Sequence, residues 1–309
     1  MTSNALRSFV IVNPAAGSRI AGRRWDRLAK GLRSSLGDFE HAFTQAPGDA
    51  TRLARTALHE GFEMLVAVGG DGTLNEVVCG FFEGAVPIAP TAVLGVVALG
   101  TGGDFGRTLG QRNVESACAR LAGRDTRSID VGLARFTGHD GTPATRIFIN
   151  VASFGVSGLV ARLVNSRLKS VSGQLAFTLA TLRALARYRD QSVTLQFDDL
   201  PPRTIALTNG AFGNGRFFGA GMQVAPTAQL DDGLLDVTLW SGFGLRAFIR
   251  KRRSLYDGSH VRERGAEVLK IRRAIASSEE PLLVELDGES VGRLPLQVEV
   301  LPGALRLKV

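Results

Sequence analysis

The stretch "MLVAVGGDGTLNEVV", which runs from Met64 to Val78, decides the fold of the first half of this chain. It begins as an apolar strand, passes through a glycine loop and ends as a helix. Glycines allow a backbone to approach a ligand and to turn its N–H groups toward it. The loop also contains one acid, Asp71, which would repel a bare phosphate. A plain phosphate site therefore does not explain this loop.

The same stretch contains a marker for the start of a helix. Thr73 and Glu76 have the spacing of a capping box, which predicts that the helix begins just after Thr73. The loop then lies between the carboxyl end of a strand and a helix N-terminus, where free N–H groups and the helix dipole attract phosphate. A lone glycine-rich loop is about as often a simple tight turn, so other loops must decide.

Two further loops follow apolar strands in the same way. They are "VVALGTGGDFGR" (96–107), with Asp104, and "FVIVNPAAGSR" (9–19), with Asn13. We expect the three loops to meet at one crevice, because ligands bind outside the carboxyl ends of parallel strands. The chain lacks both the P-loop motif and the dinucleotide fingerprint. Acids in two phosphate-like loops are explained if the anion is a nucleotide that carries Mg²⁺.

Strands and helices alternate through the first third of the chain, which predicts a mainly parallel sheet. The expected strands are 7–13, 39–44, 64–68 and 92–99, and the expected helices are 25–36, 49–61 and 74–84. After about residue 128 the pattern changes to strand-like runs separated by turn signals. These runs are 127–136, 146–153, 192–197, 203–212, 234–240, 281–286 and 294–301, with helical insertions at 158–189 and 244–256.

We therefore expect an α/β N-terminal domain with a mainly parallel sheet, followed by a mainly antiparallel β-sandwich domain. The expected domains are residues 1–128 and 129–302. The last strand, 304–309, could close either domain, so residues 303–309 could join the first one. We expect the active site in the interdomain cleft.

Composition limits the class of protein. The chain has 309 residues, 44% of them hydrophobic, and a formal net charge of +8, which favours polyanionic partners. Its two cysteines, Cys79 and Cys118, are far apart and fit reduced thiols in a cytoplasmic protein. No signal peptide and no apolar run of membrane-spanning length are apparent. We expect a cytoplasmic protein that associates peripherally with the inner face of the membrane.

Two basic segments bear on the partner. Residues 246–273 hold ten basic and three acidic side chains, and leucines at helical spacing in 175–185 stand among arginines. Ordinary readings are a solvated face and an amphipathic helix that covers a sheet. Basic residues would also attract an anionic lipid surface. Nucleic acid is not expected as a partner, because no stacking pattern or known module accompanies the charge.

At its glycine loops the sequence resembles the diacylglycerol kinase catalytic family, which includes bacterial lipid kinases, sphingosine kinases and ceramide kinases. The resemblance rests on "VNPAAGS", "GGDGTLNEVVCG", "GTGGDFGR", "LDDGLLDV" and "VELDGES", which occur in the family's order over nearly the whole chain. Two positions depart from the family pattern. Ala16 replaces a serine, and Gly103 replaces an asparagine beside Asp104.

The resemblance implies an ATP-dependent kinase that transfers the γ-phosphoryl group to a hydroxyl of diacylglycerol or a related lipid at a membrane surface; a homodimer is compatible with it. It implies ATP and Mg²⁺, with Asp71 and Asp104 organising the metal and phosphates. It assigns ATP binding to Asn13, Pro14, Ala15, Ala16, Gly17, Thr44, Gly69, Gly70, Asp71, Gly72, Thr73, Leu74, Asn75 and Thr101.

The resemblance also assigns the general base and a structural metal site. The base is Glu289 of the "DGE" element, although the residues alone favour an Asp-Gly β-hairpin, which could also carry the base. A structural Mg²⁺ is implied at Asp232, with carbonyls from Gln229 and Leu234, where the residues again suggest only a hairpin turn. Two other functions stay open: a kinase of a soluble acceptor such as NAD, and a catalytically silent lipid-binding regulator.

Overall fold

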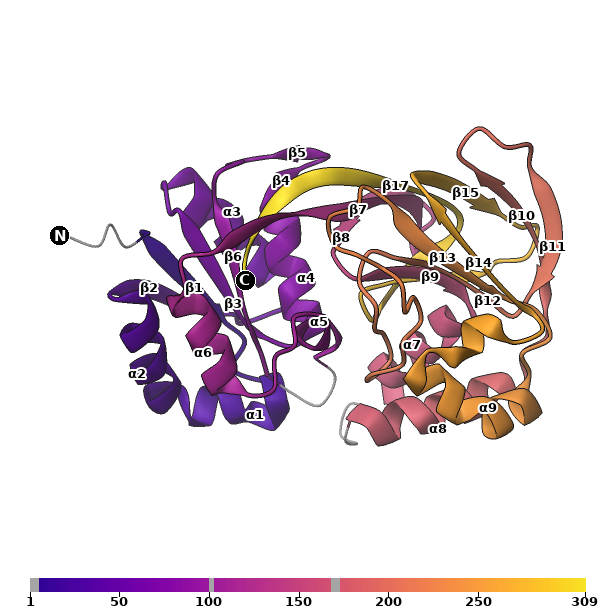
Figure 1. Ribbon diagram of the computed structural model, residues 1–309, viewed down its shortest axis with the longest axis horizontal. Helices are drawn as coiled ribbons and strands as arrows, with labels where there is room; N and C mark the ends of the chain where they lie inside the picture. Colours follow the sequence, from indigo (N-terminus) through magenta and orange to yellow (C-terminus); the bar gives the residue numbers. More distant parts are fainter. Residues whose placement is uncertain (1–5, 100–102, 168–172) are drawn as a thin grey trace. The chain divides into compact units, whose positions relative to one another are not determined.

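The structure is a computed structural model that describes residues 6–99, 103–167 and 173–309 (Figure 1). The chain divides into two compact units. Unit 1 comprises Met1–Ile129 with Gly303–Val309, and unit 2 comprises Asp130–Pro302. Each unit is described by itself.

Unit 1 is built on a parallel sheet, as the alternation of strands and helices predicts. Its strand order is β2-β1-β3-β6-β17. The strands are β1 (Ser8–Val12), β2 (Phe39–Phe43), β3 (Met64–Gly69), β6 (Val93–Ala98) and the end of β17 (Glu289–Lys308). Arg306 and Leu307 of β17 pair in parallel with Val93 and Leu94 of β6. The last strand therefore closes the sheet of unit 1.

Helices cover this sheet. They are α1 (Ala16–Arg23), α2 (Trp25–Leu36), α3 (Asp49–His59), α4 (Asp71–Gly80), α5 (Asp104–Thr108) and α6 (Val114–Ala122). In α2, Leu28 and Leu32 are buried at helical spacing and form one core cluster with Val10 and Val66 of the strands, and Leu121 of α6 joins it. This core holds the strands whose carboxyl ends carry the glycine loops.

Unit 2 is antiparallel, which confirms the expected change of fold class. One run of strands has the order β14-β13-β12-β9-β16-β17, and β10 pairs with β11 and β15. The strands are β7 (Thr126–Gly138), β8 (Pro143–Phe148), β9 (Val151–Gly155), β10 (Gln191–Phe197), β11 (Arg203–Leu207), β12 (Asn209–Gly213), β13 (Leu235–Trp240), β14 (Ala266–Ile271), β15 (Arg273–Ser277) and β16 (Leu283–Leu286).

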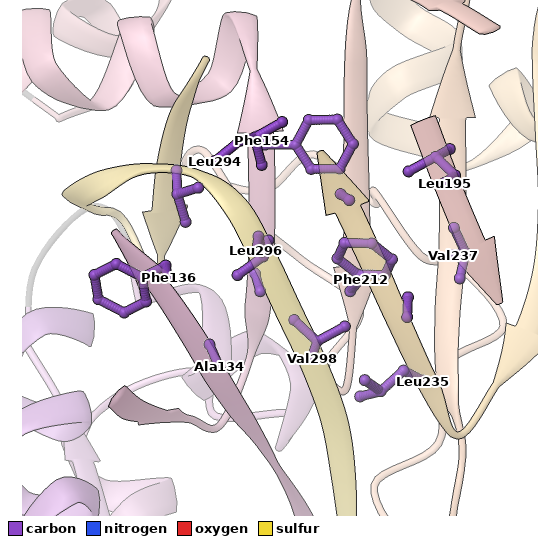
Figure 2. Close-up of a cluster of buried hydrophobic side chains, with 14 of the residues drawn as sticks. Ala134, Phe136, Phe154, Leu195, Phe212, Leu235, Val237, Leu294, Leu296 and Val298 are labelled. Carbon is purple, nitrogen blue, oxygen red and sulfur yellow. The ribbon is translucent and has the colours of Figure 1, made fainter. Parts of the chain in front are cut away.

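The core of unit 2 lies between these strands and is rich in aromatic rings. Figure 2 shows Phe154 and Phe212 from neighbouring strands within it, and their ring centroids are 6.1 Å apart. A Cβ atom at Gly210 would lie 2.3 Å from Cζ of Phe154, so only glycine leaves room for this ring. The packing fixes the strands that carry the β16–β17 hairpin.

Three helices of unit 2 lie on one side of its strands in Figure 1. They are α7 (Val156–Arg167), α8 (Gly173–Leu185) and α9 (Leu245–Asp257), and a short 3₁₀ helix, Ser259–Arg262, follows α9. They correspond to the two helical insertions expected from the sequence. Across the described part of the chain, no helix combines the length and apolar character needed to cross a bilayer.

Several sequence expectations need correction. The helix expected over 74–84 ends at Gly80, and Phe82–Glu83 forms a short hairpin strand with Val86–Pro87. The strand expected over 146–153 is split between β8 and β9. The basic run 246–273 contains the strand β14, which the charge pattern concealed. Residues 289–308 form one strand, which the sequence divided in two at Pro302-Gly303.

Candidate functional site

The N-terminus of α4 is open for a ligand. The helix begins at Asp71, three residues earlier than the capping box predicts, and its N-cap Gly70 provides no side-chain hydrogen bond. The first N–H groups of a helix have no partner within the helix. A Cβ atom at Gly69 would lie 2.6 Å from Cβ of Thr73, so the loop requires glycine there. The turn therefore presents backbone N–H groups without a side-chain cap.

The predicted capping box is wrong, because both of its side chains serve other elements. Oγ1 of Thr73 accepts a hydrogen bond from Nδ2 of Asn13 at 2.9 Å. The carboxylate of Glu76 accepts hydrogen bonds from the backbone N–H groups of Gly48, at 3.0 Å, and Ala50, at 3.1 Å. Glu76 thus caps α3, and Thr73 connects the α4 turn to the loop after β1.

The loop after β1 is held against β3 by Asn13. The backbone N–H of Asn13 donates to the carbonyl of Val68 at 3.0 Å. Its side-chain Oδ1 accepts a hydrogen bond from the N–H of Ala15 at 3.0 Å, which fixes the turn. With the bond from Asn13 to Thr73, these contacts bring the loops after β1 and β3 side by side, as expected.

Asp71 joins the α4 turn to α5. Its Oδ2 accepts a hydrogen bond from the N–H of Asp104 at 3.1 Å, and its Oδ1 accepts one from the N–H of Phe105 at 3.2 Å. Burial raises the pKa of the Asp71 carboxyl above its ordinary value, although these N–H groups and Arg107 act in the opposite direction. The acid in the glycine loop therefore caps a neighbouring helix.

The structure explains why glycine is acceptable at position 103. Gly103 is the N-cap of α5 and has φ 47° and ψ 40°, in the left-handed region. Glycine adopts this region without strain and asparagine tolerates it, so the departure from the family pattern preserves the backbone. Asp104 follows as the first residue of α5 and is 6% exposed, and its Oδ1 lies 3.4 Å from Nη1 of Arg107.

The other residues expected to bind ATP lie around these loops. The N–H of Thr44, just after β2, donates to the carbonyl of Val12 at 2.9 Å. Asn75 is fully buried and Leu74 is nearly so, which means that their side chains pack inside unit 1 and do not face a ligand. Half-buried or more exposed positions are Pro14, Ala15, Ala16, Gly17 and Gly72. Thr101 lies outside the described residues.

Glu289 stands at the end of a tight hairpin in unit 2. Asp287 and Gly288 both have positive φ, 48° and 91°, and Leu286 pairs with Glu289 across them. Positive φ at both central residues is typical of a type I′ turn. The predicted Asp-Gly hairpin is confirmed. The side chain of Glu289 is 38% exposed, and its Oε2 lies 2.8 Å from Nη2 of Arg146.

Asp287 anchors this hairpin, a role that the sequence motif did not reveal. Its carboxylate accepts hydrogen bonds from three consecutive backbone N–H groups, those of Ile149, Asn150 and Val151, at 2.9 to 3.0 Å. Asp287 is 5% exposed. Its charge is therefore satisfied inside the unit, which leaves Glu289 as the acid of the hairpin that faces solvent. Arg146, the partner of Glu289, had no signal in the sequence.

The loop at Asp232 does not fit a divalent cation. Oδ1 of Asp232 accepts a hydrogen bond from the N–H of Leu234 at 3.1 Å, and Oδ2 lies 2.6 Å from Nζ of Lys270. The same ammonium lies 2.9 Å from Oδ2 of Asp236, which is 1% exposed. An ammonium thus stands where the resemblance implies Mg²⁺ with Gln229, Asp232 and Leu234.

Comparisons with known protein families match both units. The profile of the diacylglycerol kinase catalytic domain matches residues 7–134. The profile described as the YegS C-terminal NAD kinase beta sandwich-like domain matches residues 150–309. Together the two profiles cover most of the chain.

Individual relatives agree. The chain is 29% identical over 297 residues to the diacylglycerol kinase of Bacillus subtilis (strain 168), across 94% of this chain and 91% of that protein. It is 33% identical over 264 residues to a protein of Chromohalobacter salexigens named "Probable lipid kinase YegS-like", across 84% and 80% of the two chains. A crystal structure of a candidate diacylglycerol kinase from Bacillus anthracis superposes with a TM-score of 0.79 at 25% identity, over 99% of this chain and 98% of that one.

Proposed function

Because this chain belongs to the diacylglycerol kinase catalytic domain family, we propose that it is an ATP-dependent lipid kinase that phosphorylates a hydroxyl of diacylglycerol or a related lipid. Its substrate would then lie at a membrane surface, on the cytoplasmic side where ATP is available. The observation that carries the proposal is the uncapped first turn of α4, placed at the carboxyl ends of three neighbouring parallel strands. This is where α/β sheets bind phosphorylated ligands.

In the proposed reaction, unit 1 holds the nucleotide. Backbone N–H groups of Asp71, Gly72 and Thr73 bind the phosphates, and Asn13 keeps the β1 loop in place through its bond to Thr73. The carboxylate of Asp71 has more lone pairs than its N–H partners use, so it can accept a hydrogen bond from a metal-bound water. The Mg²⁺ that accompanies ATP would neutralise charge on the phosphates. Asp104, whose N–H bonds to Asp71, adds a second carboxylate beside it.

Glu289 is the proposed general base. Its carboxylate accepts the proton of the lipid hydroxyl as that oxygen forms a bond to the γ-phosphorus and the bond from phosphorus to the β,γ-bridging oxygen breaks, which releases ADP. Arg146 orients the carboxylate through the ion pair, and the hairpin fixes its backbone. That Glu289 meets the nucleotide loops of unit 1 stays a prediction.

The test is to incubate the protein with labelled ATP, Mg²⁺ and a panel of acceptors dispersed in detergent micelles, and to identify the labelled product. The panel includes diacylglycerol, ceramide and sphingosine, with NAD as the soluble acceptor. We expect label in a diacylglycerol-like lipid. Label in NAD alone would replace the proposal with a kinase of a soluble acceptor, and no labelled product would favour a silent lipid-binding protein.

Glu289→Gln is the matched inactive variant. It keeps the shape of the side chain but cannot accept a proton, so we expect turnover to fall by about 10²- to 10⁴-fold. ATP binding, measured by calorimetry, should change little, because Glu289 lies in unit 2 and the proposed phosphate contacts lie in unit 1. Wild-type turnover in this variant would remove Glu289 from the mechanism.

A further inference from the structure

The helices α8 and α9 of unit 2 carry exposed aliphatic side chains next to exposed arginines. Leu175, Leu179 and Ile249 are 55%, 46% and 62% exposed, although large apolar side chains are normally buried. Arg183, Arg250 and Arg253 stand beside them on the same two helices. Among the described residues, no carboxylate lies within ion-pair distance of these three arginines. Exposed aliphatic side chains and exposed arginines thus occur together on these two helices.

Helical spacing places these side chains on the outer faces. Leu175, Leu179 and Arg183 follow one another at intervals of four residues and therefore lie along one side of α8. In α9, Phe248 and Leu255 are buried, whereas Ile249, Arg250 and Arg253 are exposed on the other side. We call these six residues, Leu175, Leu179, Arg183, Ile249, Arg250 and Arg253, the docking face.

The two helices present their exposed sides in a common direction. Leu185 of α8 and Phe248 and Leu255 of α9 belong to one buried cluster, so the inner sides of both helices share a core. Figure 1 shows α8 and α9 on the same side of the strands of unit 2. The outer sides, which carry the docking face, are therefore turned away from the sheet together.

The charge around the docking face is mainly positive. Residues 141–189, which include α8, contain no Asp or Glu at all, and the one acid of α9 is its last residue, Asp257, whose pKa is lowered in part by the charge of Arg253. The rest of the basic run 246–273 is different, because Lys251, Lys270 and Arg273 are paired with Glu263, Asp232 and Asp199. On the outer side of α9, Arg250 and Arg253 are exposed and have no carboxylate within ion-pair distance among the described residues.

We propose that the docking face binds the surface of an anionic lipid bilayer. Leu175, Leu179 and Ile249 enter the boundary between headgroups and acyl chains, and the arginines contact anionic headgroups, which is the arrangement of helices that lie in a membrane interface. The inference rests on the proposed function for its biological purpose, since a lipid kinase must reach a substrate in a bilayer.

Two other occupants fit the observations less well. A second copy of the chain that presented the same face in a symmetric dimer would bring arginines against arginines. Single-stranded nucleic acid is bound by aromatic side chains that stack on bases, whereas the exposed apolar residues here are aliphatic. An anionic bilayer satisfies both the apolar and the charged part of the face.

Binding to vesicles tests the apolar part. Sedimentation with phosphatidylcholine vesicles that contain phosphatidylglycerol is compared for wild type, the double variant Leu175→Ser with Leu179→Ser, and the control Leu200→Ser. Leu200 is 61% exposed and lies in the turn between β10 and β11 of the same unit. We expect the double variant to bind at least about tenfold more weakly, because two leucines no longer leave water. The control should bind as wild type does.

Charge is tested by a matched pair of double variants. Arg250→Gln with Arg253→Gln removes two charges from the docking face, and Arg264→Gln with Arg272→Gln removes two exposed charges elsewhere in unit 2. We expect about a fivefold loss of binding for each charge removed from the docking face, and a smaller loss in the control. Raising the salt concentration should abolish the difference.

Insertion can be observed directly. Leu179→Trp and Leu200→Trp each add one tryptophan to the native Trp25 and Trp240. Lipids brominated near the headgroup should quench the added fluorescence of Leu179→Trp and leave that of Leu200→Trp unchanged. Equal quenching of both, equal binding by all variants, or binding of RNA that vesicles do not displace would each overturn the proposal.

The outcome is separable from that of the proposed function. If the protein phosphorylates a lipid in detergent micelles but the variants of the docking face bind vesicles like wild type, the docking face is wrong and the kinase stands. If vesicles bind as expected but no lipid is phosphorylated in micelles, the kinase is wrong and the docking face stands.

Discussion

Asp71 is a carboxylate held by backbone N–H groups just after the carboxyl end of β3, and its burial raises its pKa. In the unfolded chain the pKa returns to its ordinary value of 3.8. Since the folded value is higher, the folded state binds this proton more tightly. The contribution of Asp71 to the free energy of unfolding is therefore complete below the unfolded pKa and is lost as the pH rises through the folded pKa.

The variant Asp71→Asn isolates this effect, because asparagine does not titrate. We expect it to cost about 1 kcal/mol as a weakened helix cap of α5. The cost, obtained from urea unfolding of both proteins, should be larger near pH 3.5 than near pH 7. The difference in the free energy of unfolding between the two proteins cancels the pH dependence that the other carboxylates contribute to both. A cost that grew with pH would contradict the direction of the pKa shift.

Lys270 is the second residue whose charge can be tested. Its ammonium lies between Asp232 and the buried Asp236, so Lys270→Gln leaves Asp236 without its charged partner. We expect a loss of about 2 kcal/mol in the free energy of unfolding, reduced from the value for a fully buried pair because Lys270 is itself 35% exposed. Lys251→Gln, which breaks the pair with Glu263, is the control and should cost less than about 1 kcal/mol.

Thermal unfolding of the wild type tests the metal site that the resemblance implies at Asp232. Because Lys270 already neutralises Asp232, thermal unfolding of the wild type should be the same in EDTA and in MgCl₂. A wild type that Mg²⁺ stabilises would show that a cation displaces the ammonium from Asp232.

Among the helices, α3 and α4 pack closely against each other at Gly80. A Cβ atom at Gly80 of α4 would lie 2.5 Å from Cβ of Ala54 and 2.7 Å from the carbonyl oxygen of Thr51, both in α3. Gly80→Ala should therefore destabilise the protein by about 1–3 kcal/mol through overpacking. In α2, Gly31 has nothing closer than Sγ of Cys118 at 3.6 Å. Gly31→Ala should stabilise by about 0.5–1 kcal/mol.

Urea unfolding followed by the fluorescence of Trp25, which lies in α2, measures both variants. Opposite signs are the essential result, since both substitutions add the same methyl group to a helix. If Gly80→Ala were as stable as Gly31→Ala, the helices α3 and α4 would not pack as closely as described.

The types of most helices and strands were predictable from the sequence, but the hydrogen-bond partners of individual side chains were not. The periodicity of apolar residues and the positions of turn residues identified the strands that carry the loops and the Asp-Gly hairpin. These patterns depend only on residues that are close in sequence. Thr73 and Glu76 matched a local capping box, yet each bonds to a different segment, at Asn13 and at the start of α3. Local spacing cannot reveal a partner 60 residues away.

Charge misled the prediction in a similar way. The run 246–273 looked like one basic surface, but three of its cations are paired with acids that are distant in sequence or on another element. The strand β14 inside the run carries Lys270 toward the sheet. These paired cations do not belong to the docking face. Its basic part in α9 consists of Arg250 and Arg253, on the exposed side of the helix.

At the scale of the whole chain, one strand serves both units. β17 begins at Glu289 in the hairpin of unit 2 and ends at Lys308 in the sheet of unit 1. Leu305 and Leu307, near its end, are 2% and 0% exposed. Nη2 of Arg306 donates to Oγ1 of Thr126 at 2.8 Å, which fastens the strand to the rest of unit 1. Unit 1 therefore depends on residues that lie far from the rest of it in the sequence.

Leu307→Ala tests this dependence, with Val309→Ala as the control because Val309 is 40% exposed. We expect Leu307→Ala to destabilise unit 1 by about 2–4 kcal/mol, the range for a buried leucine that leaves a cavity. Val309→Ala should stay within about 0.5 kcal/mol of the parent. Both substitutions are made in the Trp240→Phe background, where Trp25 is the single tryptophan and its fluorescence in urea reports on unit 1. An unshifted Trp25 transition in Leu307→Ala would mean that the last strand is not part of the core of unit 1.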